Sequence, residues 1–209
     1  MTLLSKQYTK YYITKNYWDF GGGFIFDKNY KKIGKIENKL FSVNKRFEIR
    51  GIDNQIVATI QKRIASPHKK QLIKNDVGKD IGTVKRKKIP FKPPKFYFKQ
   101  GKEKYKYIAL GTKFQNSFEI FDFNNIKIAK VSKVKHSMNN LDSSINNDGE
   151  FLVLEIINNN INRIELITMV LSIENILYTT FFLSDIAGYG RLTMRLRPFG
   201  PGIKENNLK

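Results

Sequence analysis

Hydrophobic and polar residues alternate along most of the chain, in short runs separated by turn-forming residues. Each unit begins with a short alternating run and continues through a turn. A second run follows, in which an aliphatic residue, a small residue, a residue of any kind and an apolar residue stand in that order. Alternation places successive side chains on opposite faces of a β-strand, and Asn, Asp and Gly supply turn conformations. Each unit therefore predicts an antiparallel hairpin. The five hairpins, with about ten strands, lie at 24–36, 47–60, 72–84, 96–110 and 118–131.

A small residue recurs at the same place in the second run of four units. These residues are Gly34, Ala58, Gly82 and Ala129. A position restricted to Gly or Ala is typical of a crowded interior, where only a short side chain fits. We therefore expect these four positions to face the core of the sheet.

The pattern changes after residue 160. Over 161–178 the period becomes helical, and Asn158–Asn160 offer capping side chains at its start. A helix that is apolar over most of its circumference is normally buried on most sides. We thus predict one buried helix at about 161–178, with one narrow polar stripe consisting of Asn162, Glu165, Thr168, Ser172 and Asn175.

These hairpins, followed by an apolar helix, resemble the LURP-one-related proteins. The resemblance is carried by residues 22–27, 39–60 and 118–133 and by the helix, and it covers about 8–178. That family is grouped with tubby C-terminal domains and phospholipid scramblases. The resemblance implies a mainly-β fold: a closed antiparallel barrel of about twelve strands around one central hydrophobic helix. We expect a single domain over 1–178 and a partly disordered extension over 179–209.

The formal net charge of +20 favours an anionic partner. Residues 62–106 contain sixteen Lys or Arg and three acids, a net +13. Prolines at 90, 93 and 94 predict an exposed loop here. The chain is also rich in residues with A/T-rich codons, so genome composition is a second explanation for the charge. The candidate lipid-binding residues are Lys85, Arg86, Lys87, Lys88, Lys92 and Lys95.

Three functions are compatible with this basic segment. A basic loop can dock on anionic phospholipid, with nearby aromatics such as Phe91 and Tyr97 adding interfacial anchoring. Basic residues interleaved with aromatics also suit nucleic acid, although no nucleic-acid-binding motif is visible. A protein-interaction scaffold with incidental charge is the third. Tubby domains bind phosphoinositides through basic residues, but no individual residue can be matched. We favour lipid docking by a cytoplasmic monomer at the inner membrane surface.

No catalytic constellation, metal site or cofactor is predicted. The chain has no cysteine, and its two histidines, His68 and His136, lie among lysines and turn residues. Asn146, Asp148, Gly149 and Glu155 match part of a calcium-loop pattern. Ser144 occupies the first position, however, and a strand follows instead of a helix. The apolar segment 164–183 contains Glu165 and Glu174, which argues against a transmembrane helix.

Overall fold

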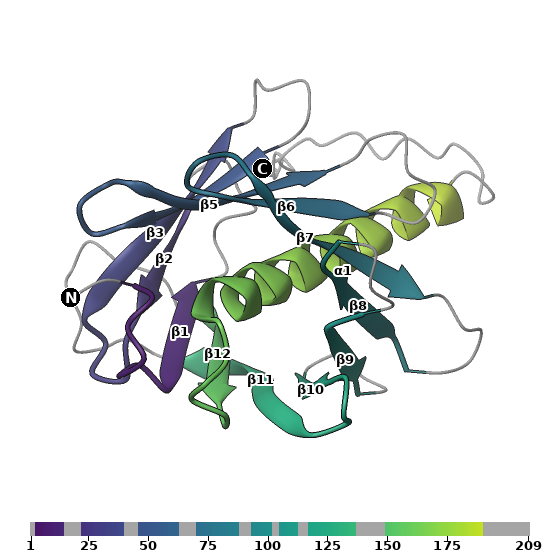
Figure 1. Cartoon of the computed structure of the whole chain (residues 1–209). Helices are drawn as coiled ribbons and strands as arrows, with labels where there is room; N and C mark the ends of the chain where they lie inside the picture. Colours follow the sequence, from purple (N-terminus) through teal and green to yellow (C-terminus); the bar gives the residue numbers. More distant parts are fainter. Residues whose placement is uncertain are drawn as a thin grey trace, which may run out of the picture. The chain divides into compact units, whose positions relative to one another are not determined.

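The computed structural model describes residues 3–14, 22–39, 46–62, 70–87, 93–101, 105–112, 117–136 and 149–189. Within them, twelve antiparallel strands form one closed barrel, as expected (Figure 1). Each strand pairs with its neighbours in sequence, and β1 closes the sheet against β12. The strands are β1 (Lys10–Thr14), β2 (Gly23–Phe26), β3 (Lys32–Lys39), β4 (Arg46–Gly51), β5 (Ile56–Lys62), β6 (Gln71–Asn75), β7 (Asp80–Lys87), β8 (Lys95–Lys99), β9 (Tyr107–Gly111), β10 (Ser117–Asp122), β11 (Lys127–His136) and β12 (Gly149–Ile156).

The predicted hairpins are confirmed, and four of them share one turn geometry. In each turn, the N–H of the first residue donates to the carbonyl of the fifth, and the N–H of the fourth donates to the carbonyl of the first. The fourth residue has a positive φ, a conformation that Gly and Asn adopt most readily. Because the strands run up and down, these turns lie at the same end of the barrel. The positive-φ residues are Tyr30, Asn54, Gly78 and Asn125.

The recurring small residues face the barrel interior, as expected. Each is paired across the hairpin with an isoleucine, as in Ile49 with Ala58 and Ile73 with Gly82. A Cβ added to Gly82 would lie 2.4 Å from Cζ of Phe98, a side chain that is fully buried. Alternating large and small side chains therefore fill this layer of the interior.

Helix α1 (Arg163–Tyr189) follows β12. Its cap is Asn162, whose Oδ1 accepts a hydrogen bond from the N–H of Ile164 at 3.0 Å, and not a residue of the 158–160 segment. The helix also continues beyond residue 178, where the periodicity predicted its end. The chain divides into two compact units, Met1–Ile176 and Leu177–Lys209. The barrel belongs to the first unit, and Figure 1 shows the first turns of α1 among its strands.

The polar stripe is buried from Glu165 onward, whereas its first residue, Asn162, is exposed. Glu165 is 3% exposed, and it accepts hydrogen bonds from the Tyr107 hydroxyl at 2.7 Å and from Lys106 Nζ at 2.9 Å. Burial, with the bond to Glu165, raises the pKa of Tyr107 well above its ordinary value. A second buried carboxylate, Glu174, lies 3.2 Å from Nζ of Lys133 on β11. The helix is therefore tied to the barrel wall at two charged points.

Candidate functional site

Part of the predicted basic loop is strand. Lys85, Arg86 and Lys87 lie in β7, and Lys95 begins β8. The predicted strand ended at residue 84, and Lys85–Lys87 were assigned to a loop because prolines follow them. The first of these prolines is residue 90, so the strand continues to Lys87. Pro94 lies just before β8, and its carbonyl accepts a hydrogen bond from the N–H of Gly111 at 3.0 Å. The two remaining candidates, Lys88 and Lys92, lie outside the described residues.

Strand alternation divides the candidates between the two faces of the sheet. Arg86 is paired with Phe96, which is 1% exposed, so Arg86 lies on the interior face. Burial lowers the pKa of Arg86. Lys85 and Lys87 alternate with the buried residues of β7 and lie on the outer face. Arg86 is therefore not part of the outer surface of the barrel.

The outer face of β7 and β8 gathers four lysines around one tyrosine. Directly opposed pairs are Lys87 with Lys95, Lys85 with Tyr97, and Thr83 with Lys99. The ring of Tyr97 lies 5.6 Å from that of Tyr105. Lys99 was not among the predicted residues, although Lys95, Tyr97 and Lys99 follow one another at two-residue steps, which was a usable signal. We call Lys85, Lys87, Lys95, Tyr97 and Lys99 the basic face.

The lysines of the basic face are not neutralised by the described part of the chain. No described carboxylate lies within ion-pair distance of Lys85, Lys87, Lys95 or Lys99. Two like charges directly opposite on neighbouring strands, as at Lys87 and Lys95, are destabilising. The arrangement therefore costs some stability that a bound anion would offset.

An equivalent surface on β3 and β4 is partly neutralised. There Glu37 and Glu48 face each other at the centre of the outer face. Glu37 lies 2.6 Å from Lys35 and 3.1 Å from Arg50, and Arg46 lies 3.0 Å from Glu48. Two carboxylates thus pair with a frame of four basic residues and leave a net charge of +2; the frame is Lys35, Lys39, Arg46 and Arg50.

The two surfaces occupy corresponding places in the hairpin repeat, because Gly34 and Gly82 are equivalent. Counting from these glycines along each strand pair, Lys85 takes the place of Glu37 and Tyr97 takes the place of Glu48. The flanking positions are basic in both surfaces except that Thr83 replaces Lys35. The basic face is therefore a copy of the β3–β4 surface in which both central carboxylates are missing.

The β3–β4 surface predicts a pH-dependent contribution to stability. The ammonium of Lys35 and, after it, Lys39 and Arg50 hold the pKa of Glu37 at about 2, below its ordinary 4.5. A lowered pKa stabilises the fold above the ordinary value, and this contribution is lost as the pH falls from about 4.5 to about 2. We expect Glu37→Gln to destabilise the protein above pH 4.5 and to match the wild type near pH 2 in urea unfolding. A difference that stays constant over this range would contradict the assignment.

Other candidate chemistry finds little support among the described residues. Glu155, the last position of the calcium-loop pattern, lies in strand β12 and pairs with Lys10 at 2.9 Å. Residues 144–148 of that pattern and His68 lie outside the described ranges. In the part of the chain that is described, no three His, Cys, Asp or Glu side chains gather as metal ligands. No helix among those residues is long and apolar enough to cross a membrane.

Comparison with known proteins settles the family. The sequence pattern that describes the LURP-one-related family matches residues 9–171. The chain belongs to the LURP-one-related family. The fold of this family member is similar to the X-ray structure of a protein from Arabidopsis thaliana. The TM-score is 0.54 and the sequence identity is 13%, and the match covers 85% of this chain and 98% of the Arabidopsis chain. No curated protein matches the chain by sequence. At that identity the solved structure shows the fold alone, and the family and barrel together indicate a tubby-like binding domain.

Proposed function

We propose that this LURP-one-related chain is a non-enzymatic binding domain whose basic face docks on anionic lipid headgroups. The observation that supports the proposal is that Lys85 and Tyr97 stand where the equivalent β3–β4 surface has the two carboxylates that pair with its basic residues. Barrel stability does not require this change, since the β3–β4 surface has the same strand geometry with both carboxylates in place. An anionic surface would supply the missing negative charge.

The composition of the basic face suits a membrane surface. Each Lys near an anionic bilayer contributes about 1 kcal/mol, so four lysines contribute about 4 kcal/mol. Tyr97 adds an aromatic ring with a polar end, which favours the boundary between headgroups and acyl chains. Lys88 and Lys92 follow β7 in sequence and remain candidates for the same surface.

Co-flotation with vesicles tests the proposal at about 0.15 M salt, where the Debye length is about 8 Å. We expect binding to anionic but not to neutral vesicles, and a loss of roughly 100-fold or more when Lys85, Lys87, Lys95 and Lys99 are replaced by Ser. The matched control carries the same charge loss elsewhere, through Ser at the exposed residues Lys28, Lys31, Lys79 and Lys130. If both variants lost the same amount of vesicle binding, net charge alone would explain the loss, and the basic face would be rejected as the lipid site.

Nucleic acid is the second candidate, because the Tyr97–Tyr105 ring pair among lysines can stack on bases while the ammonium groups contact phosphates. The same variants distinguish lipid binding from nucleic-acid binding. Single-stranded RNA that binds the wild type, but not the basic-face variant, without any vesicle binding would replace the lipid proposal. Failure to bind either polyanion would leave a protein-interaction scaffold as the remaining class.

A further inference from the structure

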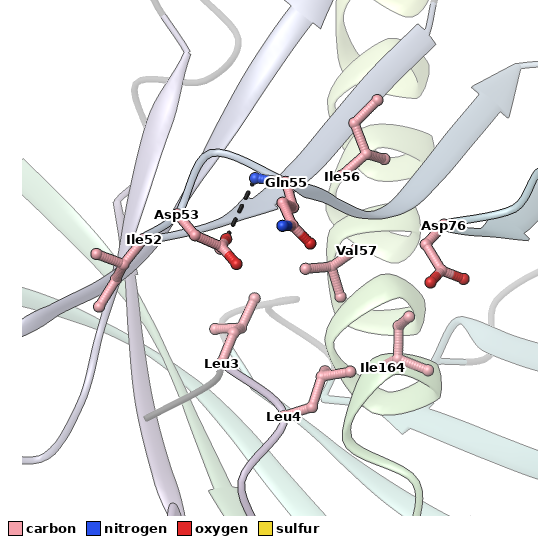
Figure 2. Close-up of a pocket in the computed structure, with 10 residues that line it drawn as sticks. Leu3, Leu4, Ile52, Asp53, Gln55, Ile56, Val57, Asp76 and Ile164 are labelled. Carbon is pink, nitrogen blue, oxygen red and sulfur yellow. Dashed lines mark hydrogen bonds between the residues drawn. The ribbon is translucent and has the colours of Figure 1, made fainter.

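A pocket of about 560 Å³ opens at the end of the barrel that carries the hairpin turns. Figure 2 shows Leu3 and Leu4 on one side of it, with Asp53 and Asp76 on either side of Val57. The walls come from four separated segments: the N-terminal residues, the β4–β5 hairpin, the β6–β7 turn and the first turn of α1. Its remaining apolar lining residues are Ile52, Ile56 and Ile164.

The charge of this pocket is opposite to that of the chain. Its lining includes two carboxylates and one amide, from Asp53, Asp76 and Gln55, and none of the described residues that line it is basic. Asp53 accepts a hydrogen bond from the N–H of Gln55 at 3.2 Å, and Asp76 accepts one from the N–H of Val77 at 3.0 Å. Within the described ranges, neither carboxylate forms an ion pair. Each therefore retains acceptor sites for a cationic donor.

The surface beside the pocket is apolar and exposed. Ile52, which lines the pocket at the tip of the β4–β5 hairpin, is 61% exposed. Val77, next to Asp76 in the β6–β7 turn, is 79% exposed. A small amine would fill the pocket and leave both side chains in water. A peptide with aliphatic residues beside its cation would cover them.

We propose that this pocket binds a lysine side chain of a partner protein segment, with aliphatic residues of that segment covering Ile52 and Val77. The butyl stem of lysine suits the apolar walls contributed by Leu3, Leu4 and Val57. Its ammonium group donates up to three hydrogen bonds and pairs with Asp53 or Asp76, which lie on either side of Val57.

This site is separate from the basic face. Asp76 lies in the turn that precedes β7, whereas Lys87 lies at the opposite end of that strand. Seven residue steps at about 3.3 Å each place Lys87 more than 20 Å from Asp80, where β7 leaves the turn, and no lysine of the basic face lines the pocket. Peptide binding therefore does not depend on the proposed lipid docking, and failure of either leaves the other standing.

Fluorescence anisotropy with a labelled Gly-Leu-Lys-Leu-Gly peptide tests the inference on the full chain. We expect binding that weakens by about 10-fold or more when norleucine replaces the lysine, because the charge-assisted bonds are lost. Asp53→Asn with Asp76→Asn is expected to produce a similar loss, and Ile52→Ser with Val77→Ser a smaller one. The control, Glu119→Gln with Glu155→Gln, removes two negative charges from surface ion pairs elsewhere.

Three results would overturn the inference. The lysine and norleucine peptides could bind equally, the doubly substituted Asp variant could bind like the wild type, or the peptide could fail to bind. Competition by n-butylamine at the same concentration as the unlabelled peptide would reject a peptide partner in favour of a free amine. Unchanged thermal unfolding of the Asp variant would show that a loss of binding is not a loss of fold.

Discussion

Lys133→Met is expected to lower the free energy of unfolding by about 3–5 kcal/mol, because it removes a cation that pairs with a buried carboxylate. Lys133 alternates with Ala129 and Val131, both buried, so it lies on the interior face of β11. Its Nζ is 3.2 Å from Oε2 of Glu174, a residue that is 2% exposed. The barrel interior offers that carboxylate too little water to replace the lysine.

Urea unfolding at neutral pH measures this loss, and a second substitution tests its cause. Adding Glu174→Met to the Lys133 variant is expected to restore most of the stability, because an apolar pair of similar volume often replaces a buried ion pair at little cost. The control is Lys10→Met, which breaks the exposed pair with Glu155 and should cost at most about 1 kcal/mol. A Lys133 variant no less stable than this control would show that the interior pair is hydrated.

Lys85→Glu combined with Tyr97→Glu should greatly weaken binding to anionic vesicles and leave thermal stability nearly unchanged. These substitutions recreate on β7 and β8 the Glu–Glu centre that the β3–β4 surface already contains in the same register. The new carboxylates would pair with Lys87, Lys95 and Lys99, as Glu37 pairs with Lys35 and Arg50. We expect the affinity for anionic vesicles to fall by roughly 100-fold, since the charge of the basic face drops by three, at about 1 kcal/mol per charge.

A control variant separates this local effect from the change in net charge. Lys28→Glu with Asn160→Glu makes the same charge change at two exposed positions away from the basic face. It should retain most of the vesicle binding. Retained binding in the Lys85 and Tyr97 variant would reject the basic face as the lipid site. A large fall in its melting temperature would contradict the equivalence of the two surfaces.

The hairpins were predictable because their signals are local. Alternating side chains, turn residues and the recurring Gly or Ala lie within about 15 residues of one another, and the barrel preserves them. The resemblance to a known family supplied the closure between β1 and β12, which joins residues more than 130 positions apart.

The candidate site was less predictable because it depends on pairing between strands. The six predicted residues were neighbours in sequence, yet Arg86 lies on the interior face and Lys99 belongs to the outer one. The prolines also extended the expected loop back over Lys85–Lys87, which strand pairing keeps in β7. The pocket carried no sequence signal, since Leu3, Asp53, Asp76 and Ile164 are brought together only by the fold.

Closure of the barrel determines how this family can diversify. Every described strand has a neighbour on both sides, so a partner cannot join by adding a strand, and copies cannot aggregate edge to edge. Recognition must use side chains on the outer wall or at the two ends. Interior positions are constrained by packing, whereas outward positions can mutate freely, which is consistent with a shared fold at 13% identity. New specificities can therefore evolve one hairpin at a time without cost to the core.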